Sequence, residues 1–298
     1  LDGIGEWDGN DHVSSLFNRL PGVSDEMKAY LRIWLRSMVA HWLQMDTLHG
    51  NECVPVLIGE QGCGKSTFCN RLLPPELRSY FFDHISFSNR FDLEMALTHA
   101  LLVNIDEFNV MTPSQMAKLK QNLSKVKVNS RPIFGRTTED RPRYSSFIAT
   151  TNERHPLCDP TGSRRFLCIE IPSGVFIDNE SPIDYAQLYA QILHELSLLG
   201  TRYWFTRDEE NRIQELNSAF MKTDDIDMMI ASSFDLENSE SQGQWMSGNE
   251  VVNVLCRNYS QLKADSGLKL RLGKALRYLG CKAKHTKRGQ EYLLSTRK

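Results

Sequence analysis

The sequence predicts an α/β protein with a parallel sheet at its centre. Three short apolar runs, at residues 54–58, 101–105 and 146–150, have the length and composition of buried strands. Helical segments separate them, and that alternation is typical of parallel sheets, because the chain must cross back before the next parallel strand can begin. The composition is that of an ordinary globular protein: the chain has 298 residues, of which 41% are hydrophobic and 24% charged.

The helical segments carry their own start and stop signals. Residues 12–45 read as helical, with Ser24 as an N-cap and apolar side chains close to a 3.6-residue period. A second helix should run from Lys65 until Pro74 stops it, and a third should open at Thr112 and end near residue 123. Capping-box patterns and further periodic runs predict later helices at about 184–199, 207–221, 247–259 and 268–279.

Charge and composition divide the chain. We expect an N-terminal helical segment at 1–50, a main domain at 51–237, a Ser-rich linker at 238–243 and a C-terminal domain at 244–298. The last region has 12 basic and 3 acidic residues, a net +9, whereas the remainder has 23 basic and 34 acidic residues, a net −11. A basic domain attached to an acidic body indicates a polyanionic partner.

The strongest motif follows the first predicted strand. Residues 59–66 fit the pattern G-x-x-x-x-G-K-[ST], in which backbone N–H groups wrap a phosphate and the following helix adds its positive end. Lys65 should reach the β- and γ-phosphates of ATP, and Ser66 should place its hydroxyl on Mg²⁺, with Thr67 as its neighbour. The nucleotide-binding residues predicted here are Gly59, Glu60, Gln61, Gly62, Cys63, Gly64, Lys65, Ser66 and Thr67.

Polar residues also follow the other two predicted strands. Asp106 can hold Mg²⁺, and the adjacent Glu107 can orient or deprotonate an attacking water. Asn152 could touch the γ-phosphate or that water. Arg164 and Arg165 match phosphate oxygens in charge and geometry, and either could stabilise charge in a neighbouring subunit's site. A surface pair tied to Asp159 or Glu153 explains the two arginines equally well.

Together these motifs make the chain resemble the virulence-associated E family. The residues that carry the resemblance are the loop at 59–66, Asn-Ile-Asp-Glu-Phe at 104–108, Ala-Thr-Thr-Asn-Glu at 149–153 and Leu-Cys-Asp-Pro-Thr-Gly-Ser-Arg-Arg-Phe at 157–166. Members are P-loop ATPases similar to superfamily 3 helicases, found in phage and plasmid primase-helicase proteins. The resemblance implies a three-layer, AAA-like core that hydrolyses ATP between the subunits of a hexameric ring. A primase domain would lie outside this chain.

The resemblance also gives Asn152 the role of a sensor and makes Arg164 and Arg165 candidate arginine fingers, without deciding between them. In related helicases the basic stretch between the acidic pair and the sensor forms hairpins that face single-stranded or forked DNA. Here that stretch runs from Lys118 to Arg143, and its candidates for nucleic-acid contact are Lys125, Lys127 and Arg136. A solvated surface hairpin is an equally good interpretation.

The C-terminal region resembles small winged-helix modules. Helical segments precede a basic hairpin whose turn lies at Arg288-Gly289. Cationic side chains on such a helix or wing neutralise phosphates. The candidates are Lys274, Arg277, Lys284, Lys287 and Arg288. The alternative is a basic surface that docks on the acidic body.

The function predicted from the sequence is an ATP-driven DNA helicase or translocase of a mobile-element replication protein. An ATP-gated regulator that reads DNA through the winged helix is the second hypothesis, and a small-molecule kinase the third. Seven cysteines without a metal-binding spacing indicate reduced thiols in a cytoplasmic protein. No membrane partner is expected, because no stretch approaches the ~18 apolar residues of a span.

Overall fold

The chain folds into two compact units, Leu1–Met221 and Lys222–Lys298, in a computed structural model. The structure describes residues 3–45, 48–87, 89–130, 139–159, 162–222, 225–236, 243–259, 262–286 and 289–296. The units are considered separately below.

The first unit is built on a five-stranded sheet. All of its strand pairs are parallel, as the sequence predicted. In spatial order the strands are β2 (Phe81–Phe82), β3 (Leu102–Ile105), β6 (Ser146–Thr151), β1 (Val54–Ile58) and β7 (Phe166–Glu170). The outermost strands, β2 and β7, were not predicted: β2 has two residues, and β7 directly follows the Arg164-Arg165 motif. Because β6 lies between β1 and β3, the chain segments that follow these three strands leave the same sheet edge side by side.

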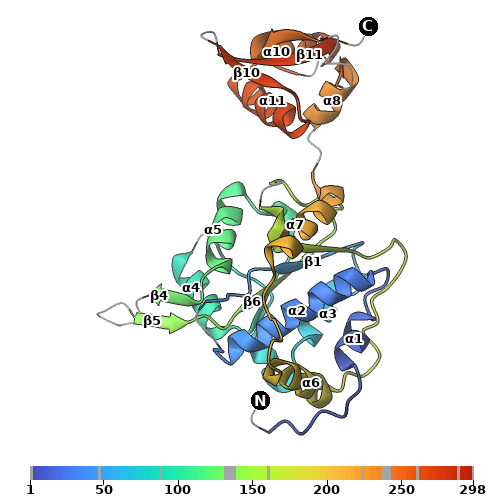
Figure 1. Cartoon of the computed structure of the whole chain (residues 1–298), viewed down its shortest axis with the longest axis vertical. Coiled ribbons are helices and arrows are strands. Elements are labelled where there is room, and N and C mark those ends of the chain that lie inside the picture. The colour runs from blue at the N-terminus through green and yellow to red at the C-terminus, as the bar shows by residue number, and fades with distance from the viewer. Residues whose placement is uncertain are drawn as a thin grey trace. The chain divides into compact units, whose positions relative to one another are not determined.

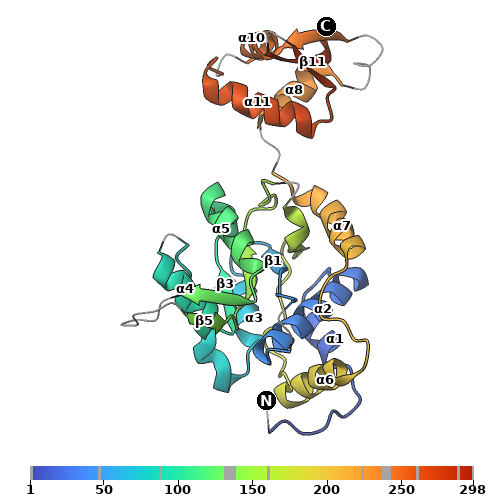
Figure 2. The ribbon, with the colours of Figure 1, turned by 60° about the vertical axis from the view of Figure 1, so that its left-hand side comes forward.

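Helices cover both faces of this sheet, which gives three layers (Figures 1 and 2). One face packs against α1 (His12–Phe17), α2 (Asp25–Trp42), α3 (Lys65–Arg71) and α6 (Tyr185–Ser197), and the other against α4 (Arg90–His99) and α5 (Pro113–Leu123). Strand side chains alternate between the two cores. Leu57 joins the first core, whereas its neighbours Val56 and Ile58 join the second.

Hydrogen bonds confirm the predicted helix starts. Ser24 accepts from the Met27 N–H, and Thr112 forms a capping box with Gln115. The predicted segment 12–45 is two helices rather than one, since Pro21 and Gly22, whose φ is +78°, interrupt it. The remaining elements of the first unit are η1 (Pro75–Tyr80), η2 (Phe108–Val110), β4 (Lys127–Ser130), β5 (Glu139–Pro142), η3 (Ser163–Arg165), α7 (Arg207–Leu216) and η4 (Asn217–Phe220).

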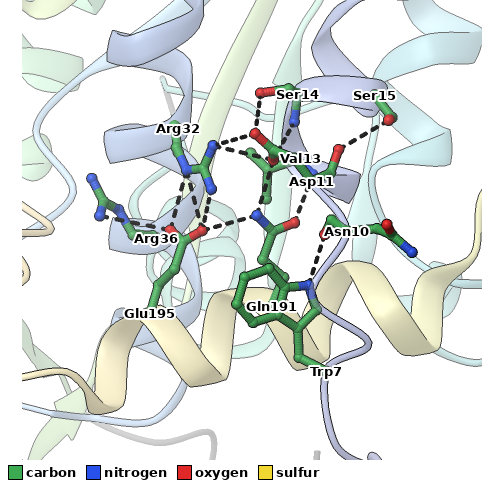
Figure 3. A network of polar contacts seen from close by, with 10 residues as sticks. All are labelled: Trp7, Asn10, Asp11, Val13, Ser14, Ser15, Arg32, Arg36, Gln191 and Glu195. Atoms are coloured by element: carbon green, nitrogen blue, oxygen red, sulfur yellow. Dashed lines mark hydrogen bonds and ion pairs between the residues drawn. The ribbon is translucent and has the colours of Figure 1, made fainter.

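A polar network ties the N-terminal helices to the rest of the first unit (Figure 3). The guanidinium of Arg32 on α2 contacts Asp11 at 2.9 Å and also pairs with Glu195 on α6, while Gln191 on α6 donates to Asp11 at 2.9 Å. Burial disfavours the charged form of Asp11, but hydrogen bonds from Gln191 and Ser14 outweigh it, so the Asp11 pKa lies below its ordinary value. The helices of the N-terminal segment therefore pack as part of the first unit.

The second unit begins earlier than the sequence indicated. Its elements are α8 (Asp225–Ser233), β8 (Phe234–Asp235), β9 (Gln244–Ser247), α10 (Gly248–Asn258), α11 (Ser266–Tyr278), β10 (Ala283–Thr286) and β11 (Gly289–Thr296). Ile226, Ile230 and Phe234 join the core of this unit, so the predicted boundary at 237 is corrected to Met221. Strand β11 pairs antiparallel with β8, β9 and β10. The sequence predicted the hairpin of β10 and β11 but not β8 or β9.

Candidate functional site

The loop at 59–66 joins β1 to α3, the strand–loop–helix context that the motif requires. Gly62 and Gly64 have φ values of +83° and +95°, which only glycine adopts without strain. Gly64 is the N-cap of α3, and Lys65 is its first residue. Side chains of Ser66 and Thr67 are exposed on the first turn of the helix. Glu60 and Gln61, near the start of the loop, are also exposed.

Lys65 links this loop to the end of β6. Its Nζ donates to the carbonyl oxygens of Gly59 and Glu60, both at 2.7 Å, and to Oδ1 of Asn152 at 2.9 Å. The residue is 7% exposed. All three oxygen acceptors are neutral, so the contacts leave the ammonium charge without an anion. The structure thus brings together two residues that the sequence placed 87 positions apart.

A segment that the sequence analysis missed holds the loop from the other side. After β7, the Ile177 N–H donates to the Cys63 carbonyl at 2.9 Å, and Asn179 Nδ2 donates to the Gly64 carbonyl at 3.0 Å. Ser173 and the Gly174 N–H donate to the Glu60 carboxylate, which holds the Glu60 pKa below its ordinary value. No sequence motif marks residues 173–179. They contact the loop because β7 ends beside it, and the end of that strand was not predicted.

Asp106 and Glu107 follow β3, two strands away from β1. The Thr150 hydroxyl, at the end of β6, donates to Oδ1 of Asp106 and orients its carboxylate. Glu107 has a φ of +49°, uncommon for a residue with a side chain, and both acidic residues are exposed. The sequence analysis named Asn152, which directly follows β6, but missed the contribution of Thr150 within that strand.

Arg164 and Arg165 lie in η3, just before β7, and both contact acidic residues of their own chain. Arg164 Nη1 is 3.0 Å from Glu210 on α7, and Arg165 Nε is 3.6 Å from Glu52. These partners differ from the Asp159 and Glu153 considered from the sequence. The Arg164 side chain is 40% exposed and that of Arg165 is 21% exposed, so Arg164 is the more accessible of the two.

The basic stretch of the first unit divides into exposed and buried cations. Strands β4 and β5 form the expected antiparallel hairpin, on which Lys127 is exposed. Lys125 is half-buried and donates to Asn122 at 2.9 Å. Arg143, the last residue of the basic stretch, is fully buried, so it does not face a nucleic acid. Arg136 lies outside the described residues.

In the second unit, the cations lie on α11 and on the β10–β11 hairpin. Lys274 and Arg277 are exposed on α11, and Arg277 Nε donates to the Gly273 carbonyl at 2.9 Å. Lys284 on β10 pairs with Glu291 at 3.2 Å. Lys287 and Arg288 lie outside the described residues.

The donor set of the first unit suits a nucleotide and its cation. Lys65 supplies a positive charge whose hydrogen bonds to oxygen, among the described residues, go to neutral groups. The glycine loop supplies backbone N–H groups, and the Ser66 hydroxyl and Asp106 carboxylate are the oxygen ligands that Mg²⁺ prefers. No cluster of three or more His, Cys, Asp or Glu side chains arranged to hold a metal occurs in the part of the chain that the structure describes. Within that same part, no helix combines the length and apolar character needed to cross a membrane.

Comparison with known proteins places these features in a family. Residues 1–222 match the virulence-associated protein E-like domain. The apo C-terminal region of NrS-1, residues 305–718 of that protein, has a similar fold, with a TM-score of 0.51 at 13% identity over 96% of this chain and 75% of that one. A second apo structure of this region gives a TM-score of 0.49 at 12% identity, over 97% and 76% of the two chains. No curated protein matches the sequence.

Proposed function

The chain belongs to the virulence-associated protein E-like family, and from that membership we propose that it is an ATP-hydrolysing motor of a DNA replication protein. The observation that carries the proposal is the contact between Lys65 and Asn152, made at the edge where β1, β6 and β3 end beside one another. In sheets of this type, ligands bind at the carboxyl ends of the strands. A phosphate chain lying there meets the glycine loop, the lysine and the acidic pair together.

Each residue has a task in this proposal. Lys65 exchanges the carbonyl oxygens of Gly59 and Glu60 for phosphate oxygens, which are better acceptors for an ammonium ion. Ser66 and Asp106 hold Mg²⁺, which neutralises phosphate charge when bound. Glu107 orients the attacking water and takes its proton. Asn152, released by Lys65, donates its amide N–H to the terminal phosphate or the water.

The first test of the proposed nucleotide site removes the charge of Lys65. Lys65→Ala should lower ATP turnover by at least about a hundredfold, since one preorganised charge-stabilising group contributes about 10²–10³ to turnover. Lys28→Ala on α2, another exchange of a lysine for alanine, should leave turnover unchanged. Steady-state phosphate release measures both. Turnover of Lys65→Ala at the unmodified rate would contradict the nucleotide site.

The motor itself requires coupling to DNA. Single-stranded DNA should stimulate ATP turnover, and the assembled protein should separate a forked duplex in an ATP-dependent way. A strand-displacement assay with a labelled fork, run beside the turnover assay, measures both effects. Absence of stimulation and of strand separation in every assembled state would exclude the motor and leave an ATPase.

The proposed site is shared between subunits, and Arg164 is the arginine that completes the neighbour's site. Its greater exposure supports this choice. Its ion pair to Glu210 does not oppose it, because an exposed pair contributes only about 0–1 kcal/mol and is readily exchanged. Mixing Arg164→Ala with Lys65→Ala subunits should restore part of the lost turnover, because mixed interfaces include intact ones. Mixtures containing Arg165→Ala in its place are the control. No recovery with either would contradict a shared site.

One observation favours the regulator as the second candidate. The order β9, α10, α11, β10, β11, with β11 between β9 and β10, resembles that of a winged helix, and we propose that this unit, like other helix-turn-helix proteins, places a helix in the DNA major groove. In that reading ATP binding switches DNA recognition and no unwinding occurs. Protection of one specific DNA sequence by the full chain in a footprinting assay, without strand displacement, would select the regulator.

A further inference from the structure

The sheet of the second unit has one buried and one exposed face. On the inner face, Met246 and Tyr292 are paired residues of β9 and β11, and both are buried in the core beneath α10 and α11. Because neighbouring residues of a strand point to opposite faces, Trp245, Glu291 and Leu293 project outward. On β10, Lys284 pairs with Glu291 in the ladder and projects the same way. Lys282, just before the strand, is exposed, and its carbonyl oxygen accepts from the Leu293 N–H beside this face. We call these five residues the outer sheet face.

Trp245, on β9, is the aromatic residue of the outer sheet face. It is 41% exposed, and the Lys284 ammonium lies 4.2 Å from the centre of its ring. The same ammonium is 3.2 Å from the carboxylate of Glu291, which is on β11, the strand between β9 and β10. An indole left this accessible, with a cation on its π surface, has the chemistry that binds planar, negatively charged ligands.

The charge around this face indicates a polyanion. The whole second unit, residues 222–298, has 13 basic and 9 acidic residues, a net +4, and its positive charge is concentrated in residues 244–298, with 12 basic and 3 acidic residues. Two of the three acids are engaged elsewhere, since Glu250 caps α10 and Asp265 caps α11. The third, Glu291, pairs with Lys284. Turning Lys284 to a phosphate removes the partner of Glu291, and Asp235 on β8, opposite Ser295 in the ladder, adds another carboxylate to this side of the sheet. The attraction of a nucleic-acid strand therefore comes from the net +9 of residues 244–298 as a whole.

We propose that the outer sheet face binds single-stranded nucleic acid, with one base stacked on Trp245 and Lys284 turned to a neighbouring phosphate. Base stacking on an aromatic side chain is stronger than either contact it replaces, the exposed cation–π pair or the exposed ion pair. Lys284 also gains a phosphate partner.

A single strand fits better than a duplex, because duplex bases are stacked on one another and show only their edges in the grooves. An indole on an open sheet needs the face of a base, which only an unpaired strand offers. Helix α11, with exposed Lys274 and Arg277, packs against the inner face of the sheet and would serve a duplex instead. This inference rests on the proposal that the second unit binds nucleic acid. It specifies that a single strand binds to the outer sheet face, a surface distinct from the one on α11.

The test compares variants of the full chain by fluorescence anisotropy, with a labelled 12-nucleotide DNA strand, the same sequence as RNA, and a blunt DNA duplex. Trp245→Ala should raise the single-strand Kd by about 5–100-fold, as expected for the loss of one stacked base, and Trp245→Phe should recover most of it. The duplex Kd should stay within about twofold. Tyr278→Ala, which removes an aromatic side chain that is 45% exposed on α11, is the matched control and should leave the single-strand Kd unchanged.

A second readout reports contact directly. Adding the unlabelled strand should quench tryptophan fluorescence in the unmodified chain and less so in Trp245→Phe. A larger change in Kd and in quenching with the DNA strand or with the RNA strand identifies which of the two the face prefers. Equal changes show that the face binds any single strand. An unchanged single-strand Kd in Trp245→Ala, or an equal loss of single-strand and duplex binding, would overturn the inference. Running the series in Lys65→Ala separates this outcome from failure of the ATPase proposal.

Discussion

Gly64 determines the shape of the loop at 59–66 through its backbone alone. Its φ of +95° is strained for any residue with a side chain, and an added Cβ would lie 2.4 Å from Nδ2 of Asn179. Gly64→Ala must therefore change the loop and displace the amide that holds it. The second effect could not be foreseen from the motif, because Asn179 lies 115 residues away.

Gly64→Ala should weaken ATP binding more than it weakens folding. The left-handed conformation costs an alanine about 1–2 kcal/mol, whereas an altered loop turns its N–H groups away from the phosphate. We expect at least a tenfold rise in the Kd of a fluorescent ATP analogue. Gly5→Ala is the control, since its added Cβ meets nothing within 4 Å. Unchanged analogue affinity in Gly64→Ala would contradict the proposed role of the loop.

Arg143 shows how misleading a charge count can be. Its guanidinium donates to the carbonyl oxygens of Asn51, Asn122, Leu123, Lys125 and Ser145. Asn122 and Leu123 are at the C-terminal end of α5, where carbonyl groups lack helical partners and carry partial negative charge. Burial lowers the Arg143 pKa to about 10, and the group stays charged at neutral pH. It is a structural cation that closes a helix end.

Arg143→Met should therefore lower the free energy of unfolding by about 3 kcal/mol or more, because each buried carbonyl left without a donor costs about 1–3 kcal/mol. Urea denaturation followed by circular dichroism measures the loss. Lys127→Met, at an exposed position on β4, should change stability by less than about 0.5 kcal/mol. Equal stabilities of the two variants would show that the carbonyl cluster contributes nothing.

At the scale of single elements, helix ends explain how local sequence becomes local structure. Three capping boxes occur in the described chain, at Thr112, Thr206 and Ser247, and each satisfies backbone N–H groups that a helix leaves unpaired. The box at Thr206 also includes Arg202, whose guanidinium pairs with Glu209 at 2.9 Å. Hydrogen bonds from Arg202 and Thr206 lower the Glu209 pKa to about 2.

The start of α7 should therefore be acid-sensitive. A carboxylate with a lowered pKa stabilises the fold above its ordinary pKa of 4.5, and this contribution is lost as the pH falls toward about 2. Glu209→Gln should destabilise the protein by about 1–2 kcal/mol at pH 7, the size of a lost cap, and by less at pH 3. Urea midpoints of both proteins at the two pH values measure this difference. If the stability difference between the two proteins is as large at pH 3 as at pH 7, the lowered pKa of Glu209 does not stabilise the fold.

On the scale of the whole molecule, the division at Met221 means that each unit has its own hydrophobic core. The second unit is built around Val251, Val252 and Leu255 of α10, all at most 1% exposed. Their partners lie on α8, α11 and the sheet of the same unit. Damage to this core should therefore stay within the second unit.

Leu255→Ala should cost the second unit about 2–5 kcal/mol, the usual loss for a buried leucine, and leave ATP turnover without DNA unchanged. Hydrogen exchange followed by mass spectrometry should show lost protection in α10 and β11 but not in β1 or β6. Leu270→Ala, at a leucine that is 64% exposed on α11, is the matched control. Lost protection in the first-unit sheet would contradict independent cores.

Features that depend on neighbours along the chain could be predicted: the three inner strands, the glycine loop before α3, the capping boxes and the polar residues that follow β3 and β6. Such features are local, since turn chemistry, helix periodicity and hydrogen bonds between nearby residues set them. Features that depend on pairing between distant segments could be seen only in the folded chain. The sheet order brought Lys65 to Asn152, buried Arg143 and laid residues 173–179 against the loop, while packing assigned α8 to the second unit. These outcomes follow from which strands pair and which cores close, and no short stretch of sequence encodes that choice.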